Sequence, residues 1–344
     1  MKNFTYYRPT RAEDAVGLLD AKWGTAELLA GGTDLLDLQK EYIAQPDKVV
    51  SVGALESGEF SAIQADRNGQ QIKIGAGVKL AAIAEHPVLR ELFPALTTAA
   101  GAIGGPQIRN MGTLGGNLCQ RNRCWYFRDE HVNCLLKGGE KCFALDGDNR
   151  YHAIFTKGHQ CVIVSPSTLA PVLIALGATA EIIGAQGRRI VELDRFFHAP
   201  STAVEREHKL SPNELVLSVQ FSLPQKKDDG QALAPKNASY EVRHKQAYDW
   251  PLVQAAVAFY LEGGRASKAK VVLGHVAPMP RISEAAAGAL EGKEVNEESA
   301  AAAGAAATAG ANPLAQNGYK VKLIEVAVKR AILTAAGQKK YWEV

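Results

Sequence analysis

Five cysteines lie close together in a chain that has no others. They are Cys119, Cys124, Cys134, Cys142 and Cys161, within a sequence of 344 residues. Cysteines that only fill a core would be scattered, and disulfide frameworks are typical of secreted domains. The N-terminal sequence MKNFTYYRPTRAED contains no apolar segment of the signal-peptide type. The clustering therefore favours metal ligation by thiolates.

A glycine-rich turn follows a strand predicted at 26–30. It consists of Leu29, Ala30, Gly31, Gly32, Thr33, Asp34 and Leu35. Adjacent glycines let backbone N–H groups converge on an anion, because no Cβ stands in the way. Such a turn can cradle a pyrophosphate, although a simple tight turn has the same composition. The spacing differs from the dinucleotide fingerprint of doubly wound sheets, so no such fold is predicted.

A second glycine-rich segment runs from Arg109 to Asn117. It joins a glycine pair to hydroxyl and amide side chains, including Thr113, Gly116 and Asn117. Two unrelated turns are the simpler interpretation. Two such turns in one domain nevertheless favour a ligand with two ends, such as a dinucleotide held across a cleft.

The surrounding sequence predicts the elements that position these turns. Apolar runs indicate strands at 26–30, 48–52, 71–75 and 215–223, and a hairpin formed by 178–183 and 189–191. Helical spacing indicates helices at 11–19, 87–104 and 169–176. Thr10 with Glu13 resembles a capping box for the first of these helices, and Ser167 is a suitable N-cap for the third.

Two domains are expected. A charged, proline-flanked segment at 225–235 separates residues 1–224 from residues 236–344, and the cysteines occupy an irregular insertion at 119–162. The second domain should consist of strands at 239–244, 253–261 and 269–276, followed by helices at 284–309 and 319–336. This pattern predicts the α+β class.

Composition restricts the partners. With 47% hydrophobic and 22% charged residues and a net charge of +3, the chain has the profile of a soluble globular protein without a long basic run. No nucleic-acid partner is therefore expected. The most apolar stretch, 169–183, is broken by Pro171 and Gly177 and is too short for membrane insertion. A cytoplasmic location follows, or a periplasmic one by co-export with a signal-bearing partner.

Three segments together resemble a known family. AGGTDLL, IRNMGTLGGNL and SPSTLAPVLIALGA have the order and spacing found in the FAD-binding subunits of the xanthine dehydrogenase, carbon monoxide dehydrogenase and aldehyde oxidoreductase family. The resemblance covers residues 1–224, and the end of the chain resembles the small C-terminal flavoprotein domain. It implies a two-part α+β FAD domain of the vanillyl-alcohol oxidase type, followed by an α+β C-terminal domain.

The resemblance also implies roles for individual residues. The backbone from Leu29 to Leu35 would cradle the FAD pyrophosphate, and Val216 would lie near the flavin ring. Thr168 stands where the family usually has Asp. Trp250 matches an aromatic residue that covers the isoalloxazine in some members, with core packing as the alternative. The adenosine and pyrophosphate side would be lined by Ile103, Gly104, Thr113, Gly116 and Asn117. A basic residue after the linker is expected among Arg243, His244 and Lys245, of which Lys245 is the candidate.

The cysteine insertion resembles a subset of this family. The FAD subunits of bacterial aldehyde oxidoreductase and 4-hydroxybenzoyl-CoA reductase carry a [4Fe-4S] cluster in such an insertion. This resemblance implies the ligands Cys124, Cys134, Cys142 and Cys161. Four thiolates suit a cubane; zinc is the alternative, although paired Cys-x-x-Cys knuckles are absent. Cys119 is interpreted as a core residue, and the histidines of the stretch, His131, His152 and His159, as exposed loop residues.

The expected function is electron transfer. A molybdenum-cofactor subunit would oxidise the substrate, and a subunit with two [2Fe-2S] clusters would relay electrons to FAD here and on to an external acceptor. The sequence around Cys124 favours an aldehyde substrate, and no residue of this chain is expected to be catalytic. The alternatives are a stand-alone flavin oxidase of the vanillyl-alcohol oxidase type and a non-enzymatic metal-binding protein.

Overall fold

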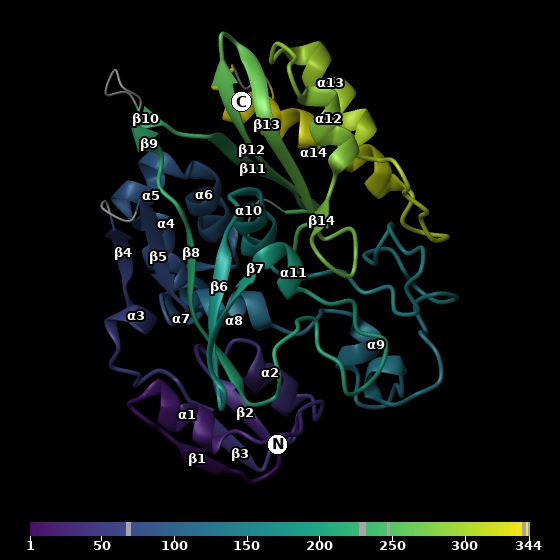
Figure 1. The fold of residues 1–344 in the computed structure, drawn as a ribbon. Helices are drawn as coiled ribbons and strands as arrows, with labels where there is room; N and C mark the ends of the chain where they lie inside the picture. Colours follow the sequence, from purple (N-terminus) through teal and green to yellow (C-terminus); the bar gives the residue numbers. More distant parts are fainter. Residues whose placement is uncertain (67–69, 227–231, 246–247, 339–341, 343–344) are drawn as a thin grey trace.

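A parallel sheet forms the N-terminal part of the fold. The computed structural model describes residues 1–66, 70–226, 232–245, 248–338 and 342. Its first three strands, β1 (Thr5–Tyr7), β3 (Lys48–Ser51) and β2 (Ala26–Leu29), pair in parallel in that order. Helices α1 (Ala12–Leu18) and α2 (Leu35–Lys40) accompany them at the bottom of Figure 1.

The second part is built on a five-stranded antiparallel sheet. Its strand order is β4 (Ile63–Asp66), β5 (Gln71–Gly75), β8 (Glu214–Ser222), β6 (Thr179–Gly184) and β7 (Gly187–Glu192). Short helices surround it: α3 (Gly58–Ser61), α4 (Leu80–Glu85), α5 (Pro87–Leu92), α6 (Pro94–Ala102), α7 (Pro106–Met111), α8 (Leu114–Cys119), α10 (Leu169–Ala175) and α11 (Leu193–Phe196).

One apolar core joins these two parts. Val50 of β3, Ile72 of β5 and Val219 of β8 are fully buried in the same cluster. Burying such side chains stabilises the fold by about 1.5–3 kcal/mol each, so the two parts are held together by their shared core. The predicted two-part FAD domain is confirmed.

A third sheet forms the C-terminal domain. Antiparallel strands β11 (Lys236–Val242), β12 (Val253–Glu262), β13 (Arg265–Gly274) and β14 (Arg281–Ile282) carry helices α12 (Glu284–Leu290), α13 (Glu297–Ala306) and α14 (Tyr319–Ala335). Strand β12 is apolar on both faces from Ala255 to Phe259 because both faces are covered. Ala255 and Val257 enter the core with α14, while Ala256 and Ala258 enter the main core.

The cysteine insertion is largely irregular, as its sequence predicts. It contains the short helix α9 (Trp125–Arg128) and a 3-10 turn at Leu135–Lys137. Figure 1 shows it at the side of the molecule, running from the level of α2 to that of the C-terminal domain. Its residues Ile154 and Phe155 are buried in the C-terminal core. Other residues of the insertion, such as Phe127, pack with Leu38 of α2, so the insertion contacts both domains.

Several predicted boundaries are wrong for local reasons. The helix expected at 87–104 is interrupted at Phe93, because Pro94 disfavours helical backbone in the residue before it. The helix expected at 284–309 is two helices separated by a turn with Gly292 at a φ of 71°. Thr10 forms no capping box, since the first helix has Arg11 as its N-cap and no side-chain cap.

The segment expected as a linker, 225–235, is only partly described. Strands β9 (Gln225–Lys226) and β10 (Ala232–Leu233) pair with each other, and residues 227–231 lie outside the described residues. Within the described part of the chain, no helix is both long and apolar enough to cross a membrane.

The packing of α13 against α14 depends on Gly304. A Cβ at this position would lie 2.4 Å from the carbonyl oxygen of Glu325 on α14. We expect Gly304→Ala to lower the free energy of unfolding by about 1–3 kcal/mol, because neither backbone can move without disturbing the other. Thermal and chemical denaturation measure the loss.

Gly288→Ala is the matched control, since a Cβ added to this exposed helical glycine would meet nothing within 4 Å. Alanine has the higher helix propensity, so this variant should be neutral or slightly stabilising. Equal effects of the two substitutions would show that close helix packing is not what Gly304 supports.

Candidate functional site

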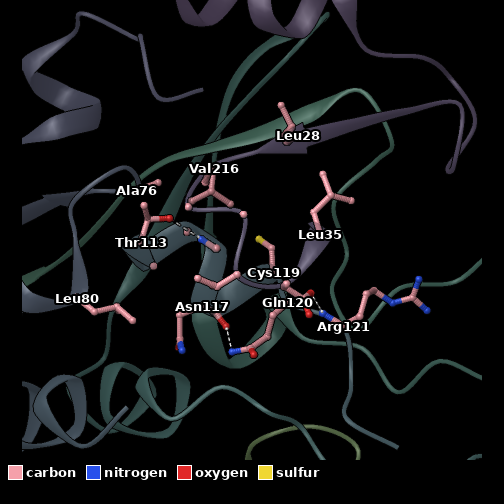
Figure 2. A pocket seen from close by; sticks show the side chains of 18 of the residues that line it. Leu28, Leu35, Ala76, Leu80, Thr113, Asn117, Cys119, Gln120, Arg121 and Val216 are labelled. Carbon is pink, nitrogen blue, oxygen red and sulfur yellow. Dashed lines mark hydrogen bonds between the residues drawn. The ribbon is translucent and has the colours of Figure 1, made fainter. Parts of the chain in front are cut away.

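A cavity of about 540 Å³ lies between the first two parts of the fold. Its volume is in the range of cofactor sites. Figure 2 shows side chains from β2, α2, α8 and β8 around it. The structure brings most of the residues predicted from sequence to its wall: Ala30, Gly31, Gly32, Thr33, Asp34, Leu35, Ile103, Gly104, Thr113, Gly116, Asn117, Thr168, Val216 and Trp250.

Two of the predicted residues do not line this cavity. Leu29 is the last residue of β2, and its side chain lies within about 3.4 Å of the position a Cβ on Gly32 would take. Lys245 is exposed and outside the wall, next to residues 246–247, which the structure does not describe. Arg243 is held elsewhere, because its guanidinium donates to the carbonyl oxygen of Ala102 at 3.0 Å.

The first glycine turn packs directly on the second. A Cβ on Gly31 would lie 2.0 Å from the carbonyl oxygen of Met111, so only glycine fits there. Gly32 has a φ of 75°, which also favours glycine. Within the described residues, the amides of Gly31, Gly32 and Thr33 have no protein hydrogen-bond acceptor. The turn thus presents unpaired N–H donors to the cavity, as an anion cradle requires.

The second turn is held by its own side chains. Thr113 Oγ1 accepts from the amide of Gly116 at 3.1 Å, and Asn117 Oδ1 accepts from the Ser167 hydroxyl at 2.7 Å. Figure 2 shows Thr113 and Asn117 on the cavity wall, with the first of these hydrogen bonds dashed. The N-cap of α10 is Thr168 rather than the predicted Ser167, but the Ser167 hydroxyl accepts from the Ala170 amide at 3.1 Å, so this turn and α10 form one unit.

Thr168 and Trp250 connect the cavity to the C-terminal domain. The Thr168 carbonyl accepts from Gln254 Nε2 at 2.9 Å, and its hydroxyl lies 3.5 Å from His275 Nε2. Trp250 is 45% exposed and lies at the cavity wall rather than in a core. The guanidinium of Arg123 lies 4.8 Å from its ring centroid.

Sequence reasoning missed three arginines that line the cavity. Arg121, Arg123 and Arg206 each lie beside both a carboxylate and an aromatic ring. Arg121 pairs with Glu207 at 2.7 Å. Burial lowers the pKa of Arg206 to about 10. Burial alone would raise the pKa of Glu207, but the positive charge of Arg121 holds it below its usual value. No motif marks residues 206–208, which only the fold brings to the turn.

Asp34 joins the first turn to the insertion. Its carboxylate accepts from the Arg121 amide at 2.9 Å and from Arg128 Nη2 at 2.7 Å. Arg123 Nη1 lies 2.9 Å from the same carboxylate. All three partners come from the segment that carries Cys124. Charge-assisted hydrogen bonds of this kind are stronger than neutral ones, so the turn and the insertion are coupled.

The cysteines separate into two groups. Cys119 packs against the main core and lines the cavity, and burial raises its pKa to about 12. The other four lie in the insertion. Burial raises the pKa of Cys124 to about 12, with smaller contributions from Cys142 and Cys134. The Cys161 thiol hydrogen bonds to the Cys142 sulfur, which lowers the pKa of Cys142 to about 6 and raises that of Cys161.

The prediction that the three histidines are exposed loop residues is wrong for His152. Its side chain is 3% exposed, and its Nε2 lies 3.2 Å from Cys124 Sγ. Burial lowers its pKa to about 4, so the ring is neutral at pH 7. The fold buries it because Ile154 and Phe155, which follow closely in the chain, enter the C-terminal core. His131 is exposed, and His159 is partly buried.

The described residues form no site for a single metal ion. Within the described residues, no three His, Cys, Asp or Glu side chains are arranged so that they could hold a metal ion. The four insertion cysteines nevertheless influence one another electrostatically across the insertion.

Comparisons with known proteins place the chain in a family. The FAD binding domain in molybdopterin dehydrogenase matches residues 2–225, and the CO dehydrogenase flavoprotein C-terminal domain matches residues 238–335. The chain is 32% identical to the aldehyde oxidoreductase FAD-binding subunit PaoB of Escherichia coli K12, over 98% of this chain and 100% of that one. It is 27% identical to the carbon monoxide dehydrogenase medium chain of Hydrogenophaga pseudoflava, over 96% of each.

Structural similarity agrees with these matches. A carbon monoxide dehydrogenase from Hydrogenophaga pseudoflava, which lacks the Mo-pyranopterin moiety, superposes with a TM-score of 0.73 at 26% identity, covering 97% of this chain and 98% of that one. The chain belongs to the FAD-binding medium subunits of the molybdenum hydroxylase family. The predicted α+β architecture and the interpretation as a molybdenum hydroxylase subunit, rather than a stand-alone flavin oxidase, are confirmed.

The contact between the two turns should be needed for cofactor binding. In Gly31→Ala, the added methyl would collide with the Met111 carbonyl and push the first turn out of place. We expect the Kd for FAD to rise by about 5- to 140-fold, as a strain of about 1–3 kcal/mol implies. Flavin fluorescence titration of flavin-free protein measures it.

Gly17→Ala in α1 is the control, because an added Cβ there would meet nothing within 4 Å, and this variant should bind FAD normally. If Gly31→Ala also bound FAD with the affinity of the unaltered chain, the close approach of the turns would have no role in binding.

Three buried histidines should make the fold sensitive to acid. Burial lowers the pKa of His152 and of His208 to about 4 and that of His275 to about 3, from 6.5. From pH 6.5 down to about 4, the unfolded chain therefore binds more protons than the folded one. The free energy of unfolding should fall as the pH falls through this window, by up to about 1.4 kcal/mol per pH unit for each histidine.

Denaturation at pH 7, 6 and 5 measures this slope. His275→Gln should reduce the slope of the free energy of unfolding against pH by the contribution of one histidine. His131→Gln, at an exposed position, should leave this slope unchanged. A slope that is the same in all three proteins would contradict the assignment to buried histidines.

Proposed function

We propose that FAD binds in the cavity with its pyrophosphate on the turn from Leu29 to Leu35. The unpaired amides of Gly31, Gly32 and Thr33 carry this proposal, because they are donors that a phosphate would satisfy. The guanidinium of Arg121 supports it, since its Nη2 is buried without a hydrogen-bond partner. Ile103, Gly104, Thr113, Gly116 and Asn117 would line the adenosine and pyrophosphate side.

The remaining wall would enclose the flavin ring. Val216 is buried on β8, and Thr168 is held by the C-terminal domain through Gln254. Trp250, stacked on Arg123, would cover an open side of the ring. Lys245 lies outside the cavity wall, so it would act on the flavin only from beyond that wall. Bound FAD would supply the exchange of one or two electrons, and the chain would hold it and limit its contact with water.

We also propose a [4Fe-4S] cluster held by Cys124, Cys134, Cys142 and Cys161. The support is the hydrogen bonding around the sulfurs. The amides of Tyr126 and Phe127 donate to Cys124, those of Ala144, Leu145 and Val162 to Cys142, and that of Ile163 to Cys161. Amide donors stabilise thiolates, the form that binds iron, and they tune iron–sulfur sites.

The position of Cys119 separates it from this set. It lies on the wall of the FAD cavity, and no other thiol contributes to its raised pKa among the described residues. A four-iron cluster also spans a larger volume than a single ion. These thiols shift one another's pKa but do not converge on one point among the described residues. This arrangement favours a four-iron cluster over a single zinc ion.

The partners follow from the family. We propose a heterotrimer in which a molybdenum-cofactor subunit oxidises an aldehyde and a subunit with two [2Fe-2S] clusters delivers electrons to this chain, which passes them to an external acceptor. The similarity to an aldehyde oxidoreductase subunit supports the substrate class. A cytoplasmic complex, or a periplasmic one exported with a signal-bearing partner, fits this role. We propose the domain division 1–224 and 236–344 on the basis of the two main apolar clusters, which are centred on these segments although Ala256 and Ala258 enter the first and Ile154 of the insertion at 119–162 enters the second.

The ligand set can be tested by paired cysteine variants. Cys142→Ser should lose most of the iron and acid-labile sulfide after anaerobic purification and keep its FAD, since Cys142 lies outside the cavity wall. Cys119→Ser should keep its iron. Iron, sulfide and flavin analysis, together with visible absorption, measure these contents. Iron lost from Cys119→Ser and retained in Cys142→Ser would require a different ligand set, while the flavin proposal would stand.

A further inference from the structure

We infer that His152 is a positioning residue of the cysteine site, which is formed by Cys124, Cys134, Cys142 and Cys161. The Nε2–H of His152 donates a hydrogen bond to the sulfur of Cys124 and thereby raises the reduction potential of the cluster. The inference rests on the proposed [4Fe-4S] cluster. Its basis is the contact itself: Nε2 lies 3.2 Å from Cys124 Sγ, and the histidine is almost fully buried.

The surroundings of the ring decide which nitrogen carries the proton. His152 Nδ1 is buried and, among the described residues, has no hydrogen-bond partner. A proton on Nδ1 would leave a buried N–H donor unsatisfied, which costs about 1–3 kcal/mol. A proton on Nε2 instead points at the Cys124 sulfur. The tautomer with Nε2–H is therefore favoured, and the histidine is a donor to the thiolate.

Aromatic neighbours keep the ring in this orientation. Trp125 packs edge-on against it with 5.2 Å between ring centroids, and Tyr126 lies at 6.2 Å. Both belong to α9, which begins immediately after Cys124. The same short helix therefore holds both the His152 ring and Cys124, and this constrains the distance between them.

The C-terminal domain holds the backbone of His152. Its carbonyl accepts from Lys320 Nζ at 3.1 Å and from Asn317 Nδ2 at 3.2 Å. Lys320 is 1% exposed, and its other two hydrogen bonds are to the carbonyl oxygens of Tyr151 and His275. All three protons of the ammonium form are therefore used, although burial lowers the pKa of Lys320 to about 7.

The expected effect has a definite direction. Reduction adds negative charge to a cluster and its thiolates, and a hydrogen bond to a ligand sulfur stabilises that charge. Removing the Nε2–H donor should therefore lower the midpoint potential. Replacing it with another donor at the same position should preserve the potential.

The test compares four variants of the full-length chain, purified anaerobically with its cluster. His152→Phe and the smaller His152→Leu remove the donor, whereas His152→Gln keeps an N–H near the position of Nε2. His131→Phe alters an exposed histidine of the same stretch. Potentiometric titration followed by visible absorption and electron paramagnetic resonance measures the midpoint potential, and iron analysis measures cluster content.

We expect a lower potential in His152→Phe and His152→Leu, and unchanged potentials in His152→Gln and His131→Phe. The inference would be overturned if iron-loaded Phe or Leu variants kept the original potential, or if the Gln variant shifted as far as they do. Absence of iron from the unaltered chain would instead refute the proposed cluster, so the two failures are distinguishable.

Discussion

The site depends on the close approach of two backbone segments. Gly31 in the first turn lies against the Met111 carbonyl at the start of the second, with no room for a Cβ between them. This contact joins the turn after β2 of the parallel sheet to the end of helix α7 at the cavity wall. It also leaves the amides of the first turn without protein acceptors among the described residues. At this turn the cavity wall therefore consists of backbone N–H groups, whose positions depend on the path of the main chain.

Asp34 extends this arrangement to the insertion. Through Arg121, Arg123 and Arg128 it connects the first turn to the segment that carries Cys124. The same insertion is fixed at its other end by Lys320 and Asn317 of the C-terminal domain. A long irregular segment is normally mobile because few contacts order it. Here charged and polar contacts at both ends hold it against two domains, so the cysteine site has a defined position relative to the cavity.

Much of the fold could be predicted from local patterns. Most strands of the three sheets, the hairpin of β6 and β7 and the long helix α14 follow from apolar periodicity, whereas the short strands β1, β4 and β14 were missed. The errors came from competing local signals. Pro94 interrupts a helix whose periodicity continues past it, and the alanine-rich segment conceals a turn because alanine favours helix wherever it occurs.

By itself the sequence determined which residue types could bind a cofactor: two glycine turns, a capped helix and clustered cysteines, all recognisable because their chemistry depends on neighbouring residues along the chain. Only the tertiary structure decided how these groups meet. It brought Arg206 and His208 to the cavity, separated Cys119 from the other cysteines, and buried His152 against Cys124. The reason is that burial and long-range contact arise from packing between distant segments, and no local spacing encodes them.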